Sequence, residues 1–159
     1  MSVVVSDTTP LNYLILIGSI DVLPRLFTKL LIPPAVVREL NHPRTPAAVA
    51  AWAHDLPGWA EIRAPQTNLH LGLDAGESEA ISLAAELGLA VLMDEHAGRA
   101  VAQRRGVLVL GTLAVLNIAD ARGWLDFETA VSQLRATNFR FNHVVLEKVR
   151  ALVRARHQT

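Results

Sequence analysis

The chain has 159 residues, which is enough to bury a full hydrophobic core but too few for two ordinary domains, so we expect a single domain over residues 1–159. Apolar residues make up 51% of the chain, a share high enough to suggest a buried interface between copies of the protein. The 15 basic residues balance the 15 acidic ones, so any contact with RNA must come from a local patch and not from overall charge.

The absence of cysteine excludes disulfides, thiolate zinc sites and cysteine nucleophiles. The opening residues, MSVVVSDTTP, lack the basic region and the sustained apolar run of a signal peptide. No stretch approaches the roughly 18 uninterrupted apolar residues of a membrane span. We therefore expect a cytoplasmic protein.

Short apolar runs alternate along the chain with longer segments of helical periodicity. Each run is too short for a helix and, apart from Glu61, is apolar throughout, which is typical of a strand buried on both faces of a parallel sheet. The predicted strands are residues 3–5, 30–32, 59–62, 90–93 and 107–110. The predicted helices are residues 10–18, 20–27, 34–40, 47–53, 74–87, 97–105, 112–122, 127–137 and 142–155.

Several helix boundaries have recognisable signals. Thr9 and Pro10 have the pattern of an N-cap followed by a proline in the first helical position. Asp74 and Glu77 have the spacing of a capping box, and Gly88 is a C-terminal stop. The alternation of strands and helices predicts an α/β fold, in which ligand sites lie at the carboxyl ends of the strands.

Two aspartates, Asp7 and Asp94, come directly after predicted buried strands. Both side chains should therefore emerge at the same edge of the sheet. Carboxylates that converge in one crevice repel each other unless a cation lies between them, and hard divalent cations are the simplest partners. The alternative for each aspartate is a role as a helix cap or a turn residue.

Glutamates provide further candidates. Glu39 lies on a predicted helix among apolar residues, and it points either inward or into solvent on the helix surface. Glu77 is either a functional carboxylate or only a member of the capping box, in which case Glu79 is the natural substitute. Glu95, which directly follows the second aspartate, is an auxiliary candidate.

Other site chemistries have little support in the sequence. His96 is the one histidine close to these carboxylates, and the others lack metal-ligand spacing, which disfavours a zinc site. The chain has neither a nucleophile-elbow serine nor a glycine-rich phosphate loop, which disfavours acyl transfer and nucleotide hydrolysis. Any catalysis would therefore depend on the carboxylates.

Four segments stand out by their order and spacing: VVSDTTPLNYLILIG, IPPAVVREL, LDAGESEAISLAAELGLAVLMDEHAGRAVAQRRGVLVLGTLAVL and FRF. Together, over nearly the whole chain, they resemble PIN-domain proteins, in particular an uncharacterised bacterial branch related to the VapC-type toxins. The resemblance implies a three-layer α/β/α fold with a mainly parallel central sheet. It also implies an acidic cluster that binds Mg²⁺ or Mn²⁺ for the cleavage of RNA.

By position in the family pattern, the metal-binding and catalytic residues implied by the resemblance are Asp7, Glu39, Glu77 and Asp94. The third acid is glutamate where many of the toxins have aspartate. The fourth directly follows the strand, where many of the toxins place it slightly later. We expect these residues, with Glu79 as the substitute for Glu77, to converge within a few ångströms at the strand ends.

Secondary candidates flank the acids. Thr9 and Thr112 are able to hydrogen-bond a phosphate or a ligand carboxylate, although a helix cap and a turn are their simpler roles. Arg99 is expected to brace the acidic cluster or to contact RNA phosphate. Six further basic residues form two local concentrations, which are either an RNA patch or a solvated helix surface. They are Arg104 and Arg105, and Lys148, Arg150, Arg154 and Arg156.

Two functions compete on these grounds. The first is a metal-dependent endoribonuclease, the toxin of a toxin–antitoxin pair, whose antitoxin would fill the acidic groove. The second is a catalytically inactive PIN module that binds RNA or protein, which the altered third and fourth acids favour. A phosphatase with Asp7 as nucleophile ranks last, because Thr9 stands where such enzymes commonly have an acid. We also expect a homodimer, formed through residues 113–118 or through the C-terminal helices.

Overall fold

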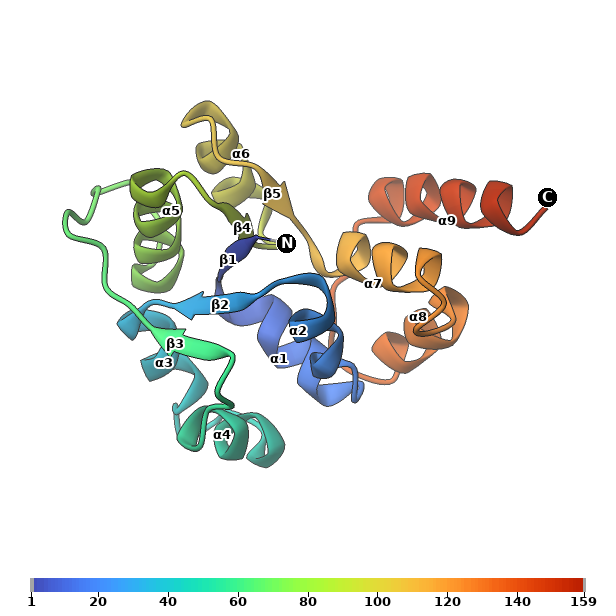
Figure 1. The fold of residues 1–159 in the computed structure, drawn as a ribbon, viewed down its shortest axis with the longest axis horizontal. Coiled ribbons are helices and arrows are strands. Elements are labelled where there is room, and N and C mark those ends of the chain that lie inside the picture. Colours follow the sequence, from blue (N-terminus) through green and yellow to red (C-terminus); the bar gives the residue numbers. More distant parts are fainter. Residues whose placement is uncertain (1, 159) are drawn as a thin grey trace.

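Five parallel strands form the centre of the protein in the computed structural model, which describes residues 2–158 (Figure 1). They are β1 (Val3–Ser6), β2 (Lys29–Ile32), β3 (Ala60–Ile62), β4 (Ala90–Leu92) and β5 (Val109–Leu110). Their order across the sheet is β3-β2-β1-β4-β5. The predicted α/β fold and its parallel sheet are therefore confirmed, and each strand lies within or overlaps its predicted range, although β5 begins two residues later than predicted.

Nine α-helices within residues 2–158 connect and cover the strands (Figure 1). They are α1 (Thr8–Leu16), α2 (Leu23–Leu26), α3 (Pro34–Leu40), α4 (Ala47–His54), α5 (Ala75–Leu87), α6 (His96–Arg104), α7 (Thr112–Ala121), α8 (Phe127–Arg135) and α9 (His143–His157). The predicted helix 20–27 is divided into a 3₁₀ turn at Ile20–Val22 followed by α2. Pro24 explains the division, because it lacks the amide that a continuous helix would bond to the Ile20 carbonyl.

Helix α1 begins two residues earlier than predicted, at Thr8. Asp7 occupies the N-cap position, with extended backbone angles of φ −79° and ψ 175°. Pro10 is tolerated within the first turn because the first four amides of a helix have no partner inside it. The prediction that Thr9 is the N-cap is therefore wrong.

The hydrophobic core lies on both faces of the sheet, because alternate residues of each strand point to opposite sides. Val4 and Leu92 belong to the core that α1, α3, α4 and the three C-terminal helices cover. Their neighbours Val5 and Val91 belong to the core beneath α5 and α6. Helices therefore cover both faces of the sheet, in agreement with the predicted three layers.

Strands β1 and β4 mark the point where the chain changes direction across the sheet. The chain passes from β1 outward to β2 and β3, then returns to the other side of β1 to form β4 and β5. In parallel α/β sheets, ligands bind at the carboxyl ends of such a strand pair. The register pairs Ser6 with Leu92, so both strands end at the same level, and Asp7 and Asp94 follow them at the switch point.

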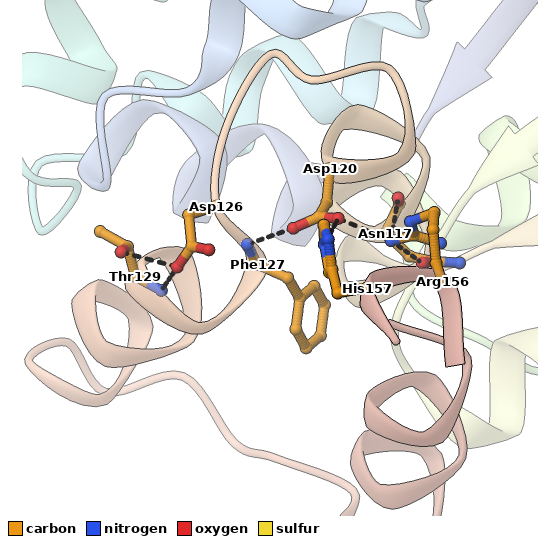
Figure 2. A network of polar contacts seen from close by, with 7 residues as sticks. All are labelled: Asn117, Asp120, Asp126, Phe127, Thr129, Arg156 and His157. Carbon is orange, nitrogen blue, oxygen red and sulfur yellow. Dashed lines mark hydrogen bonds and ion pairs between the residues drawn. The ribbon is translucent and has the colours of Figure 1, made fainter. Parts of the chain in front are cut away.

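A buried aspartate ties the C-terminal helices together (Figure 2). The Asp120 carboxylate accepts hydrogen bonds from the Phe127 amide at 2.8 Å and from Arg156 Nη2 at 2.7 Å, and His157 Nε2 lies 2.8 Å from it. Burial alone would raise the pKa of Asp120, but the bonds from these three partners outweigh it and lower the pKa. Asp120 therefore connects α7, the start of α8 and the end of α9.

We expect Asp120→Ala to lower the free energy of unfolding by about 2 kcal/mol at pH 7, since it removes a buried charge partner while Arg156 and His157 still reach solvent. Asp126→Ala is the matched control. Asp126 caps α8 by accepting from the Thr129 amide at 2.9 Å (Figure 2), and its loss should cost only about 1 kcal/mol. Urea unfolding measures the free energy of unfolding of both variants. Equal losses of stability in Asp120→Ala and Asp126→Ala would contradict a special role for Asp120.

Candidate functional site

Asp7 lies at the centre of the candidate site. It is 4% exposed and, although it occupies the N-cap position, its side chain makes no capping hydrogen bond. Burial raises the pKa of Asp7 to about 7 against the lowering effect of the Thr8 amide, and the charges of Glu39, Asp74 and Asp94 raise it further. The helix-cap alternative therefore does not account for this side chain.

Glu39 reaches the same edge of the sheet from α3. Its Oε2 accepts a short hydrogen bond from the Thr8 hydroxyl, the residue after Asp7. A methyl group at Gly76, at the start of α5, would lie only 2.5 Å from Glu39 Oε1. Glu39 is therefore partly buried between α1 and α5, and the prediction that it points inward describes it better than the solvated alternative.

The backbone amide of Glu77 takes part in the predicted helix cap, while its side chain interacts with the other acids. Asp74 Oδ1 accepts from the Glu77 amide at 2.8 Å, which confirms Asp74 as the N-cap of α5. Burial raises the pKa of the Glu77 carboxyl to about 8, together with its interactions with Asp74 and the charges of Asp7 and Glu95. The two interpretations of Glu77 are therefore compatible.

Glu79 has different partners from Glu77. Its Oε1 accepts from the Ala35 amide at 3.0 Å, and its Oε2 lies 3.7 Å from Arg38 Nη2. Ala35 lies in the first turn of α3, where Pro33 at the N-cap position provides no side-chain hydrogen bond. Glu79 therefore supplies an acceptor to the start of α3 and links that helix to α5.

Asp94 is held by the start of α7. Its Oδ1 accepts from the Thr112 amide at 2.8 Å and its Oδ2 from the Thr112 hydroxyl at 2.6 Å. Burial raises the pKa of Asp94, although the two bonds from Thr112 and the charge of Arg99 lower it in part. Arg99 is thus near enough to act on this carboxylate, as the bracing prediction requires.

The predicted acids share one edge of the sheet, but they do not form a closed metal site. Among residues 2–158, no group of three or more His, Cys, Asp or Glu side chains is arranged to hold a metal ion. The acids are still near enough for Glu39, Asp74 and Asp94 to raise the pKa of Asp7. Oxygen donors that repel one another suit a hard divalent cation, so these carboxylates fit Mg²⁺ in their chemistry. The assignment of particular carboxylates as metal ligands stays a prediction.

Several residues at this edge escaped the sequence analysis. Thr8, and not Thr9, bonds to Glu39, and Asp74 adds a charge that was assigned only to a helix cap. Gly98 and Gly111 were not singled out, yet a methyl group at Gly98 would lie 3.4 Å from a Glu77 carboxylate oxygen, and one at Gly111 would lie 3.0 Å from Asp94 Oδ1. Both glycines lie close to the turn between a strand and the helix that follows it, and this position is the sequence signal that could have identified them.

Comparison with known proteins identifies the family. A search of curated proteins finds no match to the chain. Within the described residues, no helix is long and apolar enough to cross a membrane. A family model described as a PIN domain matches residues 3–155, and the five-stranded parallel sheet agrees with it. The chain therefore belongs to the PIN-domain family.

Proposed function

We propose that this protein is a metal-dependent endoribonuclease that hydrolyses RNA phosphodiester bonds at the carboxylates around Asp7. PIN domains are typically nucleases, which supports a hydrolase at the coarser level. The observation that carries the proposal is the environment of Asp7, a buried carboxyl whose pKa burial and three acidic neighbours raise to about 7. Such a group is costly to ionise unless a cation binds beside it.

The residues proposed to hold the metal are Asp7, Glu39, Glu77 and Asp94. Carboxylate oxygens suit Mg²⁺ and Mn²⁺ as ligands. An ion held by only a few protein ligands keeps coordination positions open for water and for the phosphate. When bound, the ion would lower the pKa of a coordinated water and offset the charge that develops on the phosphate. Because the carboxylates already repel one another, a cation between them would draw them into a tighter group.

The remaining residues of the site position these carboxylates. Thr8 fixes Glu39 through its hydroxyl, and Thr112 holds both oxygens of Asp94. Burial and the neighbouring acids raise the pKa of Glu77 to about 8, and the residue is partly open to solvent, so it suits the orientation of the attacking water and the acceptance of its proton. The charge of Arg99 lowers the pKa of Asp94, which suits a residue that braces this carboxylate.

From the family resemblance we further propose a cytoplasmic toxin of a toxin–antitoxin pair, active as a homodimer and inhibited by an antitoxin that fills the acidic groove. The competing function is a catalytically inactive PIN module that binds RNA or protein. One observation favours it: the acids lack a ready three-ligand arrangement among the described residues. Calorimetric titration with Mg²⁺ separates the two, because an inactive module should bind the ion poorly.

The experiment that tests the nuclease is incubation of the purified protein with mixed structured RNAs in Mg²⁺, in Mn²⁺ and in a chelator. We expect cleavage with either ion and none with the chelator. A folded protein that binds Mg²⁺ but cleaves none of these RNAs would contradict the proposal, and so would cleavage that continues in the chelator.

Glu77→Gln and Glu79→Gln should have different effects in the same assay. We expect Glu77→Gln to reduce cleavage by about 10²-fold or more, since a carboxylate ligand and proton acceptor becomes a neutral amide. Glu79→Gln should leave most of the activity and lower the free energy of unfolding by about 1 kcal/mol, because it weakens the bonds to Ala35 and Arg38. The reverse pattern would make Glu79 the metal ligand.

A further inference from the structure

A cavity of about 360 Å³ lies beside Asp94, and the carboxylate cluster does not account for the rest of its lining. It lies between α6, the start of α7 and the segment from Phe139 to Val149. Its size is at the lower end of the roughly 300–1,000 Å³ of small-molecule sites. Asp94 and Gly111 follow β4 and β5, so the cavity opens at the same edge of the sheet as the proposed catalytic site.

One wall of the cavity is polar and mainly basic. His96, Arg99 and Gln103 line it from α6, where their spacing places them on one side of the helix. Arg140 lines it from the loop between α8 and α9, and its side chain is exposed. Tyr13 packs on the lining residue Phe139 and senses two charges of the lining. Burial raises the pKa of Tyr13, the charge of Asp94 raises it further and the charge of Arg140 lowers it. The two arginines outnumber the one acid of the lining, Asp94.

A second, apolar wall of the cavity includes an aromatic ring. Val145 and Val149 of α9 face the cavity, with Leu113 and Ala114 of α7. Phe139 completes this wall, and its ring centroid lies 5.0 Å from that of Tyr13 and 4.9 Å from that of Phe141 in edge-to-face contacts. Such packing holds Phe139 in place. A site with a fixed aromatic ring, an apolar wall and guanidinium groups matches a nucleotide, which has an aromatic base and an anionic phosphate.

We propose that this cavity binds one nucleotide of a single-stranded RNA, next to the phosphate presented to the carboxylate cluster. Arg140 contacts the phosphate of that nucleotide, and the base lies against Phe139 and the apolar wall. The inference rests on the proposed ribonuclease function and assigns a role to the FRF segment (Phe139–Arg140–Phe141) that the carboxylates leave unexplained. Arg140 acts as a positioning residue, while the chemistry stays with the acids.

The test measures RNA binding in the full chain with Asp7→Asn, which removes cleavage, in the presence of Mg²⁺. The probe is a short fluorescein-labelled single-stranded RNA of random sequence, followed by fluorescence anisotropy. We expect Arg140→Gln to weaken binding about tenfold and to reduce the slope of log affinity against log salt by about 1. Ala100→Leu narrows the cavity without a change in charge and should weaken binding as well.

Arg122→Gln is the matched control, because it removes the same charge from an exposed residue at the C-terminal end of α7, about 15 Å along that helix from its cavity end. If Arg140→Gln and Ala100→Leu bind the RNA as tightly as the Arg122→Gln control, the proposal is overturned, and the cavity does not bind RNA. Absence of binding in the Asp7→Asn protein would overturn it too. Cleavage by the unsubstituted protein decides the nuclease separately, so weakened binding without any cleavage would support the cavity and reject the proposed enzyme.

Discussion

Asp7→Asn should abolish RNA cleavage and at the same time make the metal-free protein more stable at pH 8. The loss of cleavage follows from the removal of a metal ligand, which is expected to cost several kcal/mol of transition-state stabilisation, or about 10³-fold in rate. The gain in stability follows from burial. Asp7 is 4% exposed and its pKa is raised to about 7, so at pH 8 the folded protein holds an ionised carboxylate that its surroundings disfavour.

The two halves of this prediction need separate measurements. Gel analysis of RNA in Mg²⁺ measures cleavage, and urea unfolding in a chelator measures stability at pH 8. Asp21→Asn is the control, because it makes the same chemical change at an exposed position. Loss of cleavage together with loss of stability would contradict our account of Asp7, since the inactive protein would then simply be a poorly folded one.

Much of the fold was predictable because of how parallel sheets are buried. The inner strands are covered on both faces, so they appear in the sequence as short apolar runs, and helices with a 3.6-residue period separate the runs; the edge strand β3 is the exception, since it contains Glu61 and leaves Ile62 exposed. The same logic placed Asp7 and Asp94 at one edge of the sheet, since Asp94 directly follows such a run and Asp7 is separated from one only by Ser6. The position of the candidate site was therefore accessible from the sequence.

The ends of elements were less predictable, because local hydrogen bonds decide them. The last strand was predicted from residue 107, but β5 begins at Val109. Gly106 adopts a left-handed conformation with φ 74°, and the Val107 amide bonds to the Ala102 carbonyl at 2.9 Å. This bond is typical of a helix C-terminus that ends at glycine, so Val107 still belongs to the end of α6.

Contacts between distant segments were not predictable at all. Thr8 and Glu39 are 31 positions apart, and Ala35 and Glu79 are 44 apart, so spacing within one helix or strand says nothing about either pair. Both pairs depend on how α3 packs against its neighbours. The choice between Glu77 and Glu79 is therefore one that only the packed structure can inform.

Without divalent metal, the protein should lose stability as the pH rises from 5 to 8. The pKa of Asp7 is raised from 3.8 to about 7, so between these values the folded state keeps a proton that the unfolded state releases. Its contribution is fully present below the unfolded pKa and is lost as the pH rises through the folded one, a total change of roughly 4 kcal/mol, of which roughly 2.5 kcal/mol falls between pH 5 and pH 8. Glu77 and Asp94 act in the same direction, whereas the lowered pKa of Asp120 matters only at more acidic pH.

Magnesium should reverse this loss at pH 8 and have little effect at pH 5, because the ion binds deprotonated carboxylates and competes with protons for them. An ion present at about 100 times its dissociation constant would add about 2.7 kcal/mol. Urea unfolding over this pH range, with Mg²⁺ or with a chelator, measures both effects, and Asp7→Asn should make the profile in the chelator less steep, with Glu77 and Asp94 responsible for the remaining slope. Stability that rises with pH in the chelator would show that the carboxylates are not strained as we describe. Stability that falls with pH but does not respond to Mg²⁺ would mean that the acids repel one another without binding the ion, which is the behaviour expected of an inactive PIN module.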